Sequence, residues 1–246
     1  MSYNVEVKNI VKKYGSKTVL DGISFQIRPG TIVGLASPNG SGKTTIIKLI
    51  ADFLTLDGGE ITVDGKKVGP ETKAVISYLP DHELFSGDDK VSKAVKFYID
   101  YHKDFDSEKC RQYLKTFKIE ENAKISSLSK GTREILMLIL TLSRDAKLYL
   151  LDEPLANVDP VNREAIVTTI LREFKEDASV IISTHLLNDV ETILDEVIMI
   201  KDNKLFCHKS VEEIREETGR SLNEFLRKLS KSIGLEVTIN ERQISA

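Results

Sequence analysis

The feature that most constrains this 246-residue chain is a glycine-rich loop placed between an apolar segment and a helical one. The segment TIVGLA (31–36) is mostly apolar and leads directly into SPNGSGK (37–43). The next residues, TTIIKLIADFL (44–54), have the apolar spacing of a helix, and we expect LDGG (56–59) to close it. The order strand, glycine-rich loop, helix is the context that a phosphate-binding loop needs.

The loop would work through backbone amides and two side chains. Glycine lets consecutive N–H groups approach a phosphate, and the start of the following helix adds its positive dipole end. Lys43 is placed to reach the β- and γ-phosphates, and the Thr44 hydroxyl to ligate Mg²⁺. The candidate nucleotide-binding residues of the loop are Ser37, Asn39, Gly40, Ser41, Gly42, Lys43, Thr44 and Thr45.

Ser37 stands where the strict pattern G-x-x-x-x-G-K-[ST] has its first glycine. A serine is tolerated there if its φ is negative, whereas a positive φ would cost about 1–3 kcal/mol. The loop alone therefore leaves three readings open: a working nucleotide site, a degenerate site, or a chance glycine-rich turn.

The composition is that of a globular protein, with 41% apolar and 30% charged residues. A net charge of −3 gives no basic field, so no nucleic-acid partner is expected. Cys110 and Cys207 are far apart and are predicted to be reduced thiols. The first residues lack the apolar core of a signal peptide, and the most apolar run, Ile135–Leu142, is too short to span a bilayer. We expect a cytosolic protein without direct membrane insertion.

Strand and helix patterns alternate along most of the chain, which favours an α/β fold with a mostly parallel sheet. Antiparallel strands are expected before the loop, at 3–15 and 18–30. A helical texture begins near residue 82 and lasts to about 145, with Val91, Ala94, Val95 and Tyr98 on one face. We read this part as a helical subdomain inserted into a domain that covers residues 1–218.

Residues 219–246 are expected to form a short C-terminal helical extension. Two capping boxes, Ser210–Glu213 and Ser221–Glu224, each open a helix. An apolar stripe of Leu222, Phe225, Leu226 and Leu229 is predicted to pack on the main domain rather than on a partner.

A second chemical feature is the segment KLYLLDEP (147–154), an apolar strand that ends in two acids. Such a strand delivers carboxylates to the edge of a parallel sheet where ligands bind. Asp152 would hold Mg²⁺ through water, and Glu153 would orient or deprotonate an attacking water. Taken alone, the pair is also compatible with a solvated strand end.

Further segments complete a pattern: LSKGT (128–132) precedes the acid pair, ANVD (156–159) follows it, STH ends at His185, and Tyr14 lies in KKYG. In order from about residue 4 to 215, these segments resemble the nucleotide-binding subunit of an ATP-binding cassette (ABC) transporter. The loop 36–45 resembles that family's Walker A motif, 148–153 its Walker B motif, 128–132 its signature and 156–159 its D-loop, while His185 matches its switch histidine and Tyr14 the aromatic that stacks on adenine.

The resemblance implies a P-loop NTPase core with an N-terminal antiparallel β subdomain and an inserted helical subdomain. It implies that ATP and Mg²⁺ bind between two cassettes paired head to tail, either identical or different. Ser129 and the Gly131 amide would contact the γ-phosphate held by the partner, next to Asp159 of the D-loop. Glu153, His185 and Lys43 would be the catalytic residues.

The family also implies partners and a location. Closing and opening of the pair would drive transmembrane permease subunits on separate chains, so the chain would sit at the inner face of the cell membrane. A signature of the type LSKG leans toward export. The transported substrate is not indicated.

Several positions depart from the family pattern. Asp81 stands where the Q-loop glutamine is expected, and a metal-ligating or coupling role remains as open as that of a turn residue. Lys130 and Thr132 replace glycine and glutamine in the signature. Tyr14 has an alternative role as a core residue at a strand end.

Two other functions stay open. One is a non-transport ABC ATPase, for which iron–sulfur assembly fits better than DNA repair or translation, since the chain has neither a long coiled coil nor a second cassette. The other is a binding-only subunit, which Ser37 and Asp81 keep open and against which Glu153 and His185 argue. His82, His102 and His208 are expected to be ordinary surface histidines.

Overall fold

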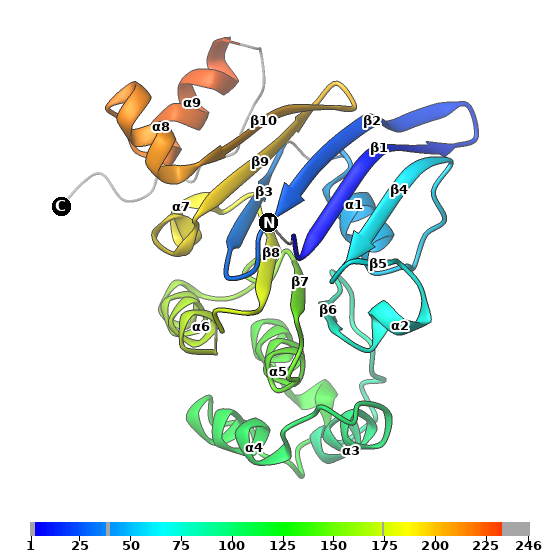
Figure 1. Ribbon diagram of the computed structural model, residues 1–246. Coiled ribbons are helices and arrows are strands. Elements are labelled where there is room, and N and C mark those ends of the chain that lie inside the picture. Colours follow the sequence, from blue (N-terminus) through cyan, green and yellow to red (C-terminus); the bar gives the residue numbers. More distant parts are fainter. Residues whose placement is uncertain (1–2, 38–39, 174, 233–246) are drawn as a thin grey trace, which may run out of the picture.

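The computed structural model describes residues 3–37, 40–173 and 175–232. Its larger sheet has the strand order β10-β9-β3-β8-β7-β6, in which all strands but β10 run parallel (Figure 1). The strands are β3 (Ile32–Ala36), β6 (Ile76–Leu79), β7 (Leu148–Asp152), β8 (Ser179–Ser183), β9 (Glu196–Lys201) and β10 (Lys204–Ser210). The predicted mostly parallel sheet is confirmed.

A smaller antiparallel sheet has the order β2-β1-β4-β5. Its strands are β1 (Val5–Tyr14), β2 (Lys17–Ile27), β4 (Gly58–Val63) and β5 (Lys66–Lys67). Helix α1 (Lys43–Ile50) shares one hydrophobic cluster with this sheet and with one face of the larger sheet, through residues such as Ile46, Ile23 and Leu35. The helix that follows the glycine-rich loop is thus held between the two sheets.

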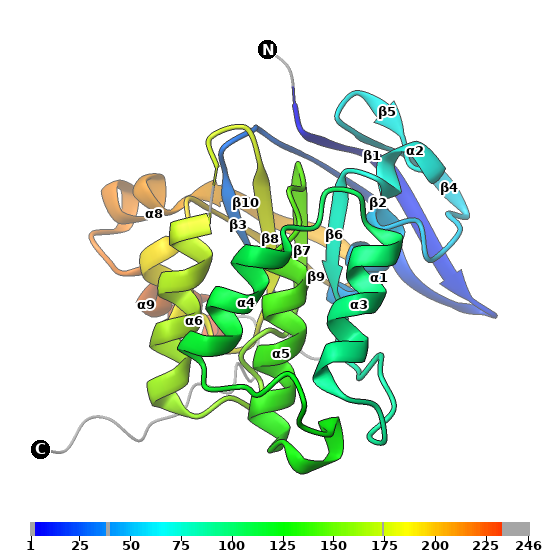
Figure 2. The ribbon, with the colours of Figure 1, turned by 90° about the horizontal axis from the view of Figure 1, so that it is seen from below.

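The other face of the larger sheet is covered by helices (Figure 2). They are α3 (Val91–Tyr101), α4 (Ser107–Thr116), α5 (Lys130–Leu142) and α6 (Pro160–Glu173). Short helical elements lie between the longer ones: α2 (Pro70–Lys73), the 3-10 turn η1 (Ile125–Ser127), α7 (Leu187–Val190) and a second 3-10 turn, η2 (Glu191–Ile193).

The helical texture predicted for 82–145 is confirmed. Val91, Ala94, Val95 and Tyr98 are all buried, as their spacing indicated. The apolar run Ile135–Leu142 is a buried part of α5. Among the described residues, no helix has both the length and the hydropathy needed to cross a membrane.

The predicted end of the first long helix is wrong. Helix α1 ends at Ile50, and the glycines expected to close it, Gly58 and Gly59, belong to β4. The helix stops because Asp52 takes a left-handed φ of 57°. The N–H of Phe53 then bonds back to the Lys48 carbonyl at 2.8 Å, a helix-ending bond that reaches five residues back.

The C-terminal part forms two helices, α8 (Val211–Thr218) and α9 (Leu222–Ser232). Both predicted capping boxes are present. Leu222 and Leu226 are buried in the cluster that covers the larger sheet, with Phe225 packed against it, so the expected packing on the main domain is confirmed for these residues. The Leu229 side chain lies outside the described part. Glu191 accepts hydrogen bonds from the Leu222 N–H (2.8 Å) and the Asn223 amide.

The prediction that His208 is an ordinary surface histidine is wrong. Its Nε2 lies 2.7 Å from a carboxylate oxygen of Glu196, a buried residue at the start of β9. The Arg28 guanidinium donates to the other oxygen at 2.9 Å. The hydrogen bond with His208, aided by Arg28, lowers the pKa of Glu196 against the effect of burial. His102 is also partly buried, which lowers its pKa, whereas His82 is exposed as predicted.

Candidate functional site

The candidate site lies at the carboxyl edge of the larger sheet, where β3, β7 and β8 end side by side. Asp152, the last residue of β7, pairs in register with Ser183, the last residue of β8. The glycine-rich loop leaves β3 at the same edge, because β3 is parallel to β8. This topology brings together residues that are more than a hundred positions apart in sequence, such as Thr44 and Asp152.

Ser37 is held by three hydrogen bonds. Its hydroxyl donates to the Ala36 carbonyl and accepts from the Ile200 N–H of β9 at 2.7 Å. Its own carbonyl accepts from Lys43 Nζ at 2.6 Å. Ser37 is not among the described residues with positive φ, so the energetic cost considered for this serine does not arise.

Two glycines of the loop adopt left-handed backbone conformations. Gly40 and Gly42 have φ values of 76° and 103°. A Cβ on Gly42 would lie 2.8 Å from a methyl carbon of Leu20, so space as well as backbone geometry favours glycine here. Asn39, which the sequence assigned to the phosphate cradle, lies outside the described residues.

Lys43 is a largely buried ammonium group at the start of α1. Burial lowers its pKa, while the nearby carboxylates of Glu153 and Asp152 oppose that shift. Ser41 also belongs to this buried region, and its hydroxyl has no hydrogen-bond partner among the described residues. A buried cation beside unpaired polar groups fits a pocket for an anion.

Asp152 is 1% exposed, and only one of its two carboxylate oxygens accepts hydrogen bonds within the described part of the chain. Its Oδ1 accepts from the Ser183 hydroxyl and, at 3.2 Å, from the Thr44 hydroxyl. Its Oδ2 is buried and has no hydrogen-bond partner within the described part of the chain. Burial raises the pKa of Asp152, and the two hydroxyl donors counter this. An unpaired buried carboxylate oxygen next to a hydroxyl fits a Mg²⁺ site, since Mg²⁺ prefers oxygen ligands.

Glu153 and His185 form a pair. The imidazole Nδ1 lies 2.8 Å from Glu153 Oε2, and the backbone N–H of His185 donates to the same oxygen at 3.3 Å. Glu153 has a left-handed φ of 52°, and its N–H donates to the carbonyl and hydroxyl of Ser183. The sequence placed both residues at strand ends, but it did not show that they bond to each other.

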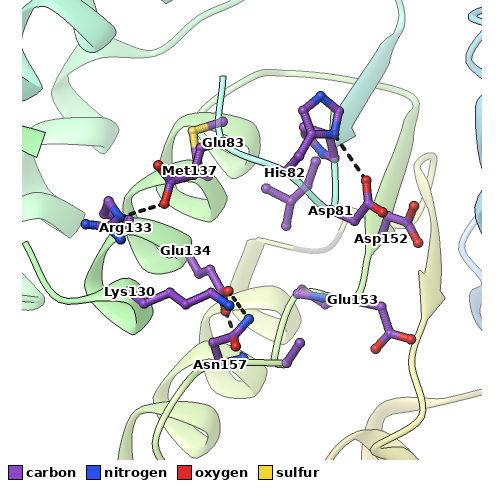
Figure 3. A pocket seen from close by; sticks show the side chains of 14 residues that line it. Asp81, His82, Glu83, Lys130, Arg133, Glu134, Met137, Asp152, Glu153 and Asn157 are labelled. Atoms are coloured by element: carbon purple, nitrogen blue, oxygen red, sulfur yellow. Dashed lines mark hydrogen bonds and ion pairs between the residues drawn. The ribbon is translucent and has the colours of Figure 1, made fainter. Parts of the chain in front are cut away.

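A pocket of about 230 Å³ adjoins these acids (Figure 3). Asp81 and Asp152 line one side of it, and Lys130, Glu134 and Asn157 lie together on the other. Asp81 is 3.1 Å from His82 Nδ1 and 3.8 Å from Lys48 Nζ. It lines the same pocket as Asp152.

The signature residues lie at the start of α5. Ser129 is exposed and caps this helix, its hydroxyl accepting from the Thr132 N–H at 3.1 Å. Gly131 approaches the D-loop so closely that a Cβ would lie 2.9 Å from the Asn157 carbonyl oxygen. Asp159 is exposed and accepts from the Asn162 N–H (3.1 Å) in the first turn of α6.

Tyr14 is not a core residue. Its side chain is 48% exposed at the end of β1, and Lys12 Nζ lies 5.6 Å from the ring centroid. The alternative of a buried strand-end residue is therefore wrong, and the ring face is accessible.

Two supporting residues were missed by the sequence reasoning. Ser183 bonds to both Asp152 and Glu153, and Glu134 bonds to the D-loop residue Asn157. A serine closing the apolar strand SVIIS was the available signal for the first. The sequence held no such signal for Glu134, because Asn157, the residue that it contacts, lies in a separate segment.

Sequence comparisons match this chain to ABC transporter ATP-binding proteins. The family model described as ABC transporter matches residues 20–156. An uncharacterized ABC transporter ATP-binding protein of Methanocaldococcus jannaschii is 31% identical over 219 residues, which cover 87% of this chain and 80% of that protein. The SkfA peptide export ATP-binding protein SkfE of Bacillus subtilis is 30% identical over 219 residues, covering 87% of this chain and 92% of that protein.

Solved structures share the fold. The ATP-binding subunit of an ABC transporter superposes with a TM-score of 0.82 at 23% identity, covering 93% of this chain and 100% of that one. A bacterial Atm1-family ABC exporter with ATP bound gives a TM-score of 0.78 at 20% identity, covering 93% of this chain and 43% of the exporter.

Proposed function

The chain belongs to the ABC transporter ATP-binding family, and on that premise we propose that it hydrolyses ATP to power transport, with Glu153 as general base. Membership implies ATP binding; the hydrolytic role is the proposal. The observation that carries it is the Glu153–His185 pair, 2.8 Å apart, beside the unpaired buried oxygen of Asp152. Phosphoryl transfer to water requires a general base, a residue that orients it and a carboxylate that can bind a metal ion, and these three groups lie at one edge of the sheet.

Each residue has a separate task in this proposal. The amides of the glycine-rich loop and Lys43 bind the phosphates. Burial disfavours the charged form of Lys43, and the negative charge of the phosphates offsets this cost. Thr44 and Asp152 would hold Mg²⁺. The ion, when bound, would neutralise charge on the phosphates. His185 holds the Glu153 carboxylate, which accepts a proton from water, and would contact the γ-phosphate.

A second cassette is proposed to complete the site. Ser129 and Asp159 are exposed at the start of α5 and before α6, so they are available to another molecule. Together with Gly131 they would contact the ATP held by the partner. Tyr14, with its accessible ring, would stack on the adenine.

Membrane subunits on separate chains are the further proposed partners, with the cassette at the inner face of the membrane. The surface that supports this proposal is the α3 patch, which we define as Phe97 and Tyr101, both exposed on α3. Phe97 lies 5.7 Å from the Phe85 ring and 4.6 Å from that of Tyr101. Phe97 contacts Phe85 in the segment that follows Asp81, so a partner bound at the patch could act on the candidate site. SkfE, a relative named for peptide export, favours export.

A binding-only subunit is the second candidate. Ser37 no longer supports it, because the serine fits its backbone and bonds to β9. Asp81 still does, because a carboxylate stands where the family has a neutral glutamine, in the pocket that Asp152 also lines.

The deciding experiment compares Mg²⁺-dependent ATP hydrolysis by the full chain and by Glu153→Gln. We expect measurable turnover by the first, almost none by the second, and an ATP-dependent dimer of the variant in size-exclusion chromatography. Glu164→Gln, which neutralises an exposed carboxylate on α6, is the matched control and should keep full turnover.

Two results separate the candidates. ATP binding without turnover by the unchanged chain would establish the binding-only subunit. Absence of ATP binding would overturn both.

A further inference from the structure

Two neighbouring charged residues in the first turns of α5 bind two different loops. Arg133 Nε donates to Glu83 in the loop after β6, at 2.7 Å, and its NH1 to the Leu128 carbonyl at 3.0 Å. Glu134 accepts from the backbone N–H of Asn157 at 3.0 Å and from the Asn157 side-chain amide. Figure 3 shows Glu134 and Asn157 pointing toward each other across one wall of the pocket.

The contact between α5 and the D-loop is also steric. The Cα of Gly131 lies against the backbone of Asn157, leaving no room for a Cβ. Leu155 and Val158, on either side, are fully or nearly fully buried. The helix start and the D-loop therefore touch through backbone packing and through the carboxylate of Glu134.

The D-loop has few short hydrogen bonds of its own. Its turn bonds, from Ala156 to Glu153 and from Val158 to Leu155, measure 3.2 and 3.4 Å. Arg163 holds the far end, through the Val158 carbonyl at 2.8 Å. In the middle of the loop, Asn157 is held by two charge-assisted bonds to Glu134, in addition to its packing against Gly131.

We propose that Glu134 is a positioning residue that fixes the D-loop to the signature helix, so that Ser129 and Asp159 meet a second cassette as one surface. The proposal rests on the function proposed above. Glu134 itself touches neither nucleotide nor water in this scheme; it acts through Asn157. Loss of the carboxylate leaves each cassette able to bind ATP but lets the D-loop move relative to the signature when two cassettes close.

The first test measures steady-state ATP hydrolysis. Glu134→Ala is expected to lower kcat about tenfold with KM changed less than about twofold, because the defect appears only in the closed pair. Glu134→Gln should stay within about threefold of the unchanged chain. A glutamine oxygen can still accept from the Asn157 N–H, and its amide can donate to the Asn157 side-chain oxygen after that side chain flips.

The second test does not depend on hydrolysis. Exchange of the Asn157 amide hydrogen, followed by NMR on the full chain, should be at least about tenfold faster in Glu134→Ala and nearly unchanged in Glu134→Gln. Glu164→Ala, with an exposed carboxylate removed from α6, is the control for charge and should change neither measurement.

Either of two results would overturn the proposal. One is an equal loss of kcat in the alanine and glutamine variants, and the other is an unchanged exchange rate of the Asn157 amide hydrogen in Glu134→Ala. If the unchanged chain hydrolyses no ATP, the proposed function fails. The exchange experiment then decides by itself whether Glu134 fixes the D-loop.

Discussion

Ser37 departs from the loop pattern, and its hydroxyl makes a contact that a glycine could not make. Strands β3 and β9 pair as far as Ala36 and Met199, and the Ser37 hydroxyl then accepts from the next N–H, that of Ile200. Ile200 is completely buried. The serine side chain thus extends the pairing by one residue and satisfies an N–H that a glycine would leave without its acceptor.

This contact predicts the effect of restoring the glycine. Ser37→Gly should lower the free energy of unfolding by about 1–3 kcal/mol, the cost of an unsatisfied buried N–H. Ser37→Ala should lower it by a similar amount, since it removes the same hydroxyl without adding backbone freedom. Turnover should change less than about tenfold, because Lys43 and Thr44 are unaffected.

Denaturant unfolding and steady-state hydrolysis measure the two effects. Unchanged stability in both variants would show that the hydroxyl contact contributes nothing. A gain in turnover above tenfold in Ser37→Gly would show that the serine disables part of the site.

The sequence revealed those site residues whose position follows from a single segment. Asp152, Glu153 and His185 end apolar strands, and parallel strands end at one edge, so their gathering could be expected. The bonds of Ser37 with Ile200 and of Glu134 with Asn157 could not, because each joins segments whose relative register no local pattern encodes.

At the scale of elements, Glu196 connects parts of both sheets. It begins β9, bonds to His208 on β10, and pairs with Arg28 directly after β2. His208, which has no partner pattern in the sequence, is therefore a partly buried partner of Glu196, which explains why the prediction for it failed. In the same way the end of α1 depended on the left-handed Asp52, which helix periodicity does not show.

Glu196 should make stability depend on pH. Its pKa is lowered below the usual 4.5, so its bonds stabilise the fold above about pH 4.5 and are lost as the pH falls through the lowered value. Glu196→Gln should cost about 2 kcal/mol at pH 7, because glutamine places a donor opposite Arg28 or His208. The difference should shrink below about pH 4.5.

Urea unfolding at a series of pH values tests this. Glu212→Gln, at an exposed position on α8, is the control for the loss of one charge. A stability difference that stays constant down to pH 3 would contradict the assignment.

At the scale of the whole molecule, the α3 patch predicts that ATP hydrolysis and binding to the membrane subunits can be impaired separately. Phe97→Ser combined with Tyr101→Ser should leave hydrolysis by the isolated chain within about twofold, since neither side chain lines the pocket. Co-purification with the membrane subunits should be lost, because the apolar contact area is removed.

Ile99→Ser provides the matched control. Ile99 is exposed on the same helix but two residues from each aromatic, so it points to another side. If Ile99→Ser lost co-purification to the same extent, the loss would come from a general disturbance of α3 and not from removal of the patch.

The hydrophobic cluster beneath the helices has a consequence for how fast the chain folds. It includes residues from Ile32 of β3 to Leu226 of α9, so this core is assembled from segments spread over most of the described chain. Contacts between segments that are distant in sequence close large loops before they gain packing energy, which slows folding. During synthesis the early strands must wait for α9 before this core is complete, and an interval with exposed apolar surface precedes the native state.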